Sequence, residues 1–197
     1  MRKILLISLL MMATLLSCYD GMIETYDNSI VYKLGDTGPA GGLICYINPD
    51  WEKDGWRYLE AAPKSTEFSN IEWGKNGDSV TGTQKTIGTG YLNTGKIIVL
   101  LNTPVAETGR AAQVCEDLSI VVNSVIYDDW FLPSLDELNL MYENLAQKGI
   151  GSFTSDHYWC SSEYDASFAW NQGFDDGYQG WNSKNGGGIR VRAIRAF

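Results

Sequence analysis

The clearest hydrophobic pattern in the chain lies between residues 134 and 149. Apolar and aromatic side chains recur there at the spacing of one helix face, at Leu135, Leu138, Met141, Tyr142 and Leu145. Ser134 and Glu137 have the S-x-x-E spacing of a capping box, in which each side chain bonds the backbone N–H of the other residue. Pro133 favours an extended residue before it, and Lys148 followed by Gly149 is typical of a helix end. We predict a helix that begins at Leu135 and ends near Lys148.

Two further helices are expected in the middle of the chain. The first begins at Asn93 or Thr94, ends at Asn102 before Pro104, and carries Ile97, Ile98, Leu100 and Leu101. The second has one apolar face made of Ala111, Val114, Cys115, Leu118 and Val121. Residues 119–126 are rich in β-branched side chains, which favours a change from helix toward strand there.

Strand patterns precede and follow these helices. We predict a hairpin of residues 30–32 and 43–47 around a Gly/Pro/Asp turn, whose two G-X-Y triplets are too few for a collagen helix. A third strand is expected at 56–61, and a long polar loop at 63–90. Later strands are expected at 158–161, 168–174 and 189–197. The order strands, helices, strands predicts an α+β domain in which both ends of the chain share one antiparallel sheet.

The first 18 residues have the pattern of a bacterial lipoprotein signal. Arg2 and Lys3 precede an apolar run that ends at Leu16, which is too short to span a bilayer. The sequence from Leu15 to Cys18 then resembles a lipobox, whose thiol would carry diacylglycerol. We therefore predict a signal peptide at 1–17, a lipidated Cys18 with an acidic tether at 18–29, and a single domain at 30–197. An ordinary signal with an incidental cysteine is the alternative.

The charge of the chain restricts its partners. The formal net charge is −9, and removal of the signal changes it to −11 because two basic and no acidic residues are lost. An acidic domain disfavours nucleic acid and adhesion to anionic lipid, so the acyl chains would have to hold it at the membrane. The remaining cysteines, Cys45, Cys115 and Cys160, allow one disulfide or none, and no spacing matches a metal knuckle.

Several segments together resemble the bacterial domain family once labelled DUF1566, also known as the C-terminal domain of the Legionella collagen-like adhesin. The matching segments are 35–42, 56–63, 87–94, 129–138, 158–163 and 190–197. The resemblance implies a C-type-lectin-like α+β fold and, for the best-known member, binding of sulfated glycans. It also implies serine where this chain has Cys160. Distant fold kinship with formylglycine-generating enzymes raises a catalytic role for Cys160, although that chemistry uses a cysteine pair.

The segment 170–182 is the best candidate for a sugar site. It combines aromatic rings with polar side chains in a glycine-rich stretch: Trp170, Asn171, Asp175, Asp176, Trp181 and Asn182. The alternative is that Trp159, Trp170 and Trp181, which recur every eleven residues, are strand residues that fill the core. The same Asp and Asn residues could bind Ca²⁺, but their spacing matches no EF-hand loop, so we expect no required cofactor.

Arg190, Arg192 and Arg195 form a basic cluster in an acidic protein. They could bind a sulfate or carboxylate, or they could be structural. In the structural case, Arg190 and Arg192 lie on one strand face and could pair with Asp129, Asp136 or Glu137. With one histidine, no G-x-S-x-G and no zinc spacing, the chain lacks the parts of a hydrolase. We expect a non-catalytic, lipid-anchored envelope protein that binds a glycan outside the cytoplasm. A structural or protein-interaction lipoprotein is the alternative.

Overall fold

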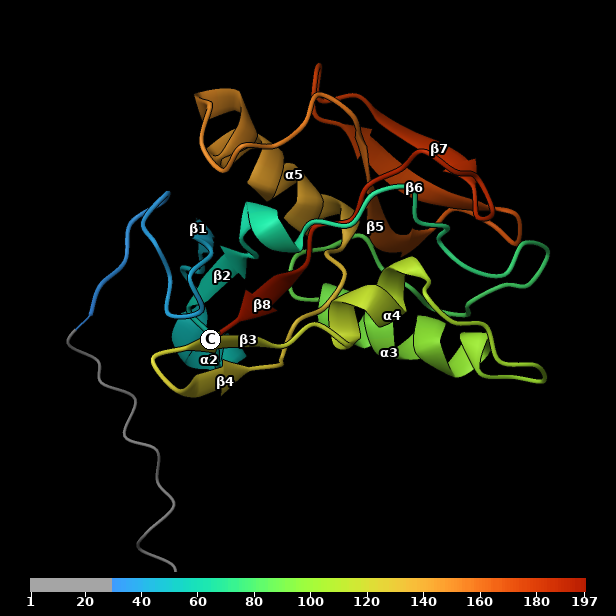
Figure 1. Cartoon of the computed structure of the whole chain (residues 1–197), viewed down its shortest axis with the longest axis horizontal. Coiled ribbons are helices and arrows are strands. Elements are labelled where there is room, and N and C mark those ends of the chain that lie inside the picture. The colour runs from blue at the N-terminus through green and yellow to red at the C-terminus, as the bar shows by residue number, and fades with distance from the viewer. Residues whose placement is uncertain (1–29) are drawn as a thin grey trace, which may run out of the picture. The chain divides into compact units, whose positions relative to one another are not determined.

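The structure is a computed structural model that describes residues 30–197 (Figure 1). Its helices are α2 (Trp51–Asp54), α3 (Gly90–Leu101), α4 (Ala111–Glu116) and α5 (Leu135–Asn144), with short 3-10 turns at Lys64–Thr66 and Ala146–Lys148. Its strands are β1 (Leu43–Ile47), β2 (Tyr58–Ala61), β3 (Ile120–Val122), β4 (Val125–Tyr127), β5 (His157–Glu163), β6 (Phe168–Gly173), β7 (Gln179–Ser183) and β8 (Ile194–Ala196). The predicted α+β class with antiparallel sheets is confirmed. None of the described helices is both long and apolar enough to cross a membrane.

The first sheet joins the two ends of the described chain. Its strand order is β1-β2-β8, and all its pairs are antiparallel, as predicted. The predicted hairpin is wrong, because residues 30–33 form no strand and β1 pairs with β2 instead. The other side of β1 is taken by a turn, in which the Gly35 N–H donates to the Ile44 carbonyl. Tyr32 packs edge-on against Tyr58, with ring centroids 5.2 Å apart.

The second three-stranded sheet has the order β5-β6-β7 and is also antiparallel. We predicted β5 and β6 but not β7. The three tryptophans of the eleven-residue repeat lie on these successive strands: Trp159 on β5, Trp170 on β6 and Trp181 on β7. Only Trp159 is fully buried, so the core alternative holds for Trp159, partly for Trp170, and not for Trp181, which is 47% exposed.

The predicted change from helix to strand is confirmed, but α4 ends at Glu116, so Leu118 and Val121 do not belong to its apolar face as expected. The strands β3 and β4 form a separate two-stranded hairpin. Its turn residues, Asn123 and Ser124, have φ of 51° and 67°, which matches the left-handed turn that such two-residue hairpins favour.

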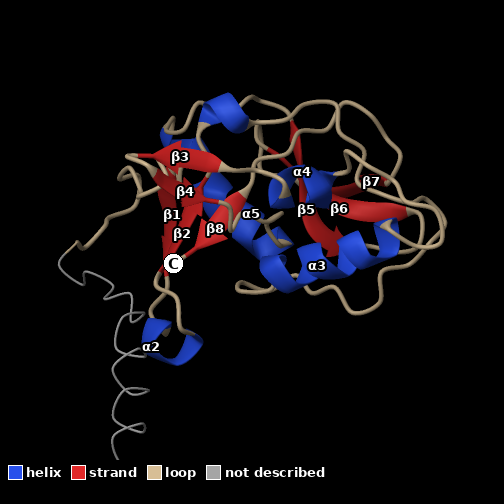
Figure 2. Cartoon of the chain, turned by 60° about the horizontal axis from the view of Figure 1, so that its bottom comes forward, coloured by secondary structure: helices blue, strands red, loops and turns tan. Residues whose placement is uncertain are grey.

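The helix α5 lies between the two three-stranded sheets (Figure 2). Its predicted capping box is present, since Ser134 Oγ accepts from the Glu137 N–H at 3.3 Å and Glu137 Oε2 accepts from the Ser134 N–H at 2.7 Å. Leu135, Leu138 and Met141 are buried in the core beside it. Burial of this apolar face on both sheets holds the sheets in one domain.

The helix α3 begins earlier than predicted, at Gly90 rather than after Asn93 or Thr94. Asn93 does not cap the helix, because its amide bonds the backbone of Gln84 instead. A Cβ at Gly90 would lie 2.2 Å from Glu137 Oε2, so only glycine allows this helix start to approach α5.

Candidate functional site

An aromatic surface lies on the sheet β5-β6-β7. We define the aromatic platform as Tyr164, Trp170 and Trp181. Trp170 and Trp181 are directly opposite each other on β6 and β7, with ring centroids 6.2 Å apart. Tyr164 follows β5 and stacks on Trp181, with centroids 4.8 Å apart and 7° between the ring planes. Because Tyr164 is 46% exposed and Trp181 47%, a large part of both rings faces solvent.

Lys85 completes the surface. Its Nζ lies 3.6 Å from the centroid of the Trp170 ring, which is a cation–π contact. Asp136 is near this ammonium group: burial raises the pKa of its carboxyl group, and the charge of Lys85 acts in the opposite direction. Among the ion pairs of residues 30–197, none involves Lys85.

The backbone on both sides of Lys85 is fixed by side chains of the core elements. The Gln84 carbonyl accepts from Asn93 Nδ2 at 2.7 Å and from Ser162 Oγ at 2.9 Å. The Thr86 carbonyl accepts from Ser134 Oγ at 3.0 Å. This part of the predicted long loop therefore has a defined position although it contains no helix or strand.

Glu137 also holds the loop that carries Lys85. Its carboxylate is fully buried and accepts from the Gly88 N–H at 2.7 Å as well as from the Ser134 N–H. Burial raises the pKa of Glu137, and the backbone N–H groups partly oppose that shift. The cap of α5 and the position of the loop thus depend on one carboxylate.

The structure does not bring the predicted polar ligand residues to the platform. The alternation along the strands directs Asn171 and Asn182 to the face opposite to Trp170 and Trp181. Asn171 is buried and its Oδ1 lies 3.0 Å from His157 Nδ1. Its Nδ2 has no hydrogen-bond partner within the part of the chain that the structure describes.

Asp175 and Asp176 lie in the turn between β6 and β7 and are exposed. Asp176 Oδ1 accepts from the Tyr178 N–H at 2.8 Å, so one of its oxygens serves the turn. Over residues 30–197, no three His, Cys, Asp or Glu side chains are grouped as a metal site would require. The calcium alternative therefore gains no support from this geometry.

The three arginines of the basic cluster are in ion pairs. Arg192 pairs with Glu67, a carboxylate that also accepts from Arg190 and from the Tyr158 hydroxyl. Burial raises the pKa of Glu67, but hydrogen bonds from Lys64 and Arg192 outweigh it, so the pKa is lowered. The predicted partners were therefore wrong for Arg190 and Arg192.

The third arginine, Arg195, pairs with Asp129, which we had expected as a partner of Arg190 or Arg192. Its Nε donates to Asp129 Oδ1 at 2.7 Å, and its Nη1 donates to the buried Glu60 at 3.2 Å. All three guanidinium groups thus have carboxylate partners inside the domain, which leaves them poorly placed to bind an external anion.

The three cysteines within residues 30–197 all lie in the core. Cys45, Cys115 and Cys160 are buried and free, and burial raises the pKa of each thiol, that of Cys160 to about 12. The Cys160 thiol donates to the Trp170 carbonyl at 3.2 Å. A thiol of this kind is protonated at neutral pH and behaves as a small core residue.

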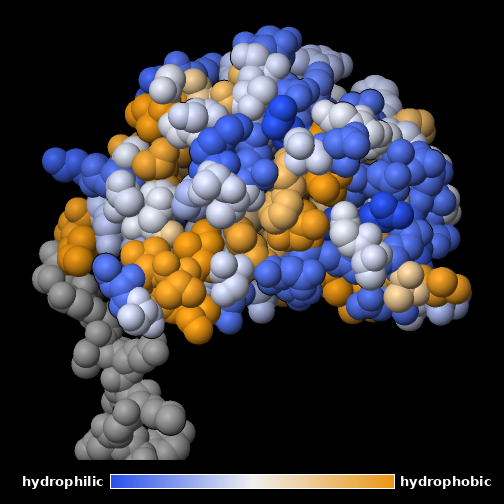
Figure 3. Space-filling model, in the orientation of Figure 1, coloured by the Kyte–Doolittle hydropathy of each residue, from blue (hydrophilic) through white to orange (hydrophobic). Residues whose placement is uncertain are grey.

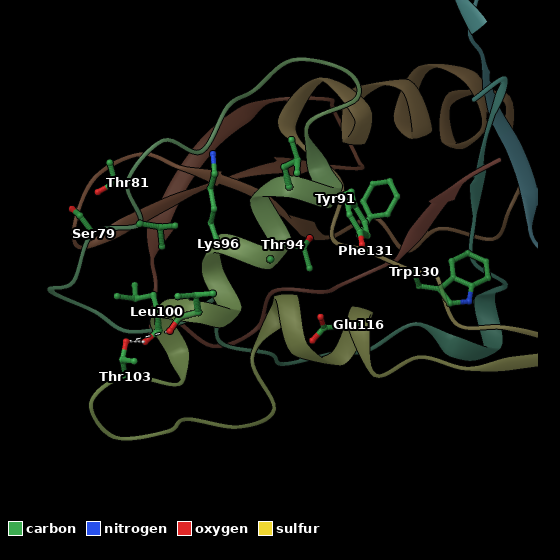
Figure 4. A pocket seen from close by; sticks show the side chains of 14 residues that line it. Ser79, Thr81, Tyr91, Thr94, Lys96, Leu100, Thr103, Glu116, Trp130 and Phe131 are labelled. Atoms are coloured by element: carbon green, nitrogen blue, oxygen red, sulfur yellow. Dashed lines mark hydrogen bonds between the residues drawn. The ribbon is translucent and has the colours of Figure 1, made fainter. Parts of the chain in front are cut away.

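A second surface feature is a groove of about 660 Å³ along α3 (Figure 4). Its apolar lining includes Tyr91, Leu92, Val99, Leu100, Trp130 and Phe131. Tyr91, Leu92 and Val99 are each more than 60% exposed, so α3 presents apolar side chains to solvent as well as to the core. Lys96 and Glu116 lie on opposite sides of α3 in this view.

The hairpin β3-β4 adds another apolar area, which is seen in Figure 3 at the place where Figure 1 shows these strands. Val121, Val125 and Ile126 are 64%, 50% and 62% exposed. Contiguous exposed apolar side chains of this kind are typical of surfaces that contact another molecule.

Comparison with known proteins assigns no family to the chain. No model of a known protein family matches the chain, and no curated protein matches it either. The resemblance to the DUF1566 family and the C-type-lectin-like fold therefore stay predictions.

Sequence reasoning found Trp170 and Trp181 but missed Tyr164 and Lys85. Tyr164 lies in a tight turn that Asp165 Oδ1 closes on the Phe168 N–H, and this Tyr-Asp turn signal after a strand could have been recognised. Lys85 gives no such signal, because its place over Trp170 depends on contacts across distant parts of the chain.

Proposed function

We propose that this protein is a lipid-anchored component of a bacterial cell envelope whose domain binds carbohydrate without catalysing a reaction. The observation that carries the proposal is the aromatic platform. An exposed tryptophan that stacks on a tyrosine, with a lysine over the neighbouring ring, offers both an apolar face and a hydrogen-bond donor to one ligand.

The chemistry of a pyranose suits such a surface. One face of the sugar ring carries C–H groups, and packing this face on Trp181 would remove apolar area from water. Hydroxyl groups at the ring edge would then meet the Lys85 ammonium or water. Tyr164 stacks on one face of the Trp181 ring and restrains it, so Trp181 would lose little rotational freedom on binding.

A glycan array tests the binding proposal. The full-length chain should bind at least one class of glycan saturably, and Trp181→Ala should weaken that binding about tenfold or more while the circular dichroism spectrum is unchanged. Tyr178→Ala is the matched control, because Tyr178 is an exposed aromatic residue outside the platform. Equal binding by the Trp181→Ala variant and the parent chain would contradict the proposal.

The anchor rests on the sequence pattern at Cys18, which lies outside the described residues. Growth of a bacterial host with radiolabelled palmitate should label the protein. Cys18→Ala should remove the label and release the protein from the membrane fraction. A label that persists in that variant would contradict lipidation at this residue.

A protein-interaction role is the second candidate, and the α3 groove favours it. The groove would suit a partner that presents an apolar stripe flanked by one acidic and one basic side chain, opposite Lys96 and Glu116. A photo-crosslinking residue at Leu92 should capture one partner saturably in cells, and Val99→Asp should prevent this. Val105→Asp is the control, since Val105 is exposed but does not line the groove.

A further inference from the structure

The cation at the aromatic platform has no partner among the ion pairs of residues 30–197. Lys64, Lys184, Arg190, Arg192 and Arg195 each have a carboxylate within 4.0 Å. Lys85 has none, which it shares with Lys53 and Lys96, and Asp136 is the carboxylate on which its charge acts. Lys85 differs from these two lysines because its ammonium group lies on an aromatic ring of the platform.

The position of this lysine is fixed by the protein. The Lys85 carbonyl accepts from the Asp136 N–H at 2.9 Å, and both of its neighbours are bonded to side chains of the core elements. The loop that carries it is therefore ordered before any ligand binds. A ligand contact here would not have to supply the free energy of ordering a loop.

The ammonium group is also next to the exposed rings. Its Nζ is 3.6 Å from the Trp170 centroid, and that centroid is 6.2 Å from the Trp181 centroid and 5.3 Å from the Tyr164 centroid. These distances keep the Lys85 ammonium within the length of a short oligosaccharide that packs on Trp181, so a neighbouring sugar unit can reach it. An anionic group on that unit would gain a charge-assisted hydrogen bond.

We infer that the platform selects saccharides that carry a carboxylate, such as hexuronic acids, with Lys85 as the specificity-determining residue. The inference rests on the proposed carbohydrate binding and names its ligand class. A single carboxylate suits a single short-range cation. A densely sulfated polymer would be repelled by the net charge of −9, because its many charges interact with the whole field of the domain.

Matched sugar pairs test this selectivity. Isothermal titration calorimetry would compare trigalacturonate with the neutral galactose trimer of the same linkage, and glucuronate oligomers with their glucose counterparts, on the full-length chain. We expect one carboxylated member to bind at least about tenfold more tightly than its neutral counterpart. Lys85→Gln should reduce its affinity to the level of the neutral sugar, and Lys85→Arg should largely restore it.

The control is Lys53→Gln, which removes an exposed lysine of α2 and should leave both affinities unchanged. If the parent chain bound both members of each pair equally, or if Lys85→Gln kept the preference for the carboxylated member, the selectivity would be overturned. The proposed function would still stand if Trp181→Ala weakened the binding in that experiment. If neither member of any pair bound while the glycan array showed binding of another glycan, the selectivity alone would fail. Silence of the array as well would defeat both proposals. Tighter binding of a sulfated oligomer of the same length would overturn the choice of carboxylate.

Discussion

Trp159 and Trp181 belong to the same three-stranded sheet but are used differently. Trp159 projects to one face, is fully buried, and donates its indole N–H to the Ile71 carbonyl at 2.8 Å. Trp181 projects to the other face and leaves 47% of its surface exposed. The inner face of the sheet thus stabilises the fold through packing, while the outer face leaves aromatic side chains exposed to solvent.

The same contrast holds for charged groups. Glu67 and Arg192 are almost completely buried and bonded to each other, whereas Lys85 is exposed and has no carboxylate partner in the described structure. Substitutions on the inner side should therefore change the free energy of unfolding, and those on the outer side should change the affinity for a ligand.

The largest effect is expected for Trp159→Ala. It removes a fully buried ring and should lower the free energy of unfolding by about 4 kcal/mol, since the cavity cannot collapse completely. Urea denaturation followed by circular dichroism measures this. Trp181→Ala is the control and should lower the same quantity by less than about 1 kcal/mol. Equal losses would contradict the division between the two faces.

Glu67→Gln should lower the free energy of unfolding at pH 7 by about 3 kcal/mol, because it leaves the buried Arg192 without its charge partner. The folded-state pKa of Glu67 is below its ordinary value of 4.5, so its contribution is present above pH 4.5 and is lost as the pH falls through the lowered pKa. The difference between parent and variant should therefore shrink below pH 4.5. Glu72→Gln, in a half-exposed pair with Arg110, should cost less than about 1 kcal/mol.

Trp181→Ala should weaken glycan binding about tenfold or more, which is equivalent to about 1.4 kcal/mol. Trp170→Ala affects binding and stability together, because it removes the ring that contacts Lys85 and also packs against the core. It should therefore reduce both binding and stability. Calorimetric titration and urea denaturation on the same samples measure the two quantities. We expect Trp181→Ala to change mainly the affinity and Trp170→Ala to change both.

The smallest effect is expected for Ser134→Ala. Loss of the helix cap should cost about 1 kcal/mol of unfolding free energy. Because Ser134 Oγ also donates to the Thr86 carbonyl, affinity for the carboxylated sugar should fall slightly while affinity for the neutral sugar stays unchanged. Ser119→Ala, at an exposed position, is the control. An unchanged unfolding free energy in Ser134→Ala would contradict the role of the cap.

Local signals in the sequence were sufficient for part of this arrangement. The start of α5 follows from four residues, because a capping box is satisfied within one helical turn. The sheet shared by both ends followed from the order of elements. The strand β7 was missed because Gly177 and Gly180 made its surroundings look like a loop, and the false strand at 30–32 had the correct composition but no free edge to pair with.

The candidate site was less accessible to such reasoning. Tyr164 lies 17 residues before Trp181, and Lys85 lies 85 residues before Trp170. The register of β6 and β7 brings the two tryptophan rings together. Asn171 and Asn182 had suitable chemistry, but strand alternation directs them to the face opposite to Trp170 and Trp181. The partners of Arg190 and Arg192 depended on Glu67, which lies 123 and 125 residues before them in the sequence.

The polar contacts that hold the loop before α3 also have a kinetic consequence. The amide groups of Val80, Gln84 and Gly88 donate to the side chains of Glu163, Asn93 and Glu137. Exchange of these amide protons with deuterium would require those side chains to release them. These three amides of the loop should therefore exchange as slowly as amides at the ends of the neighbouring helices. Their protection from exchange should be present without any ligand.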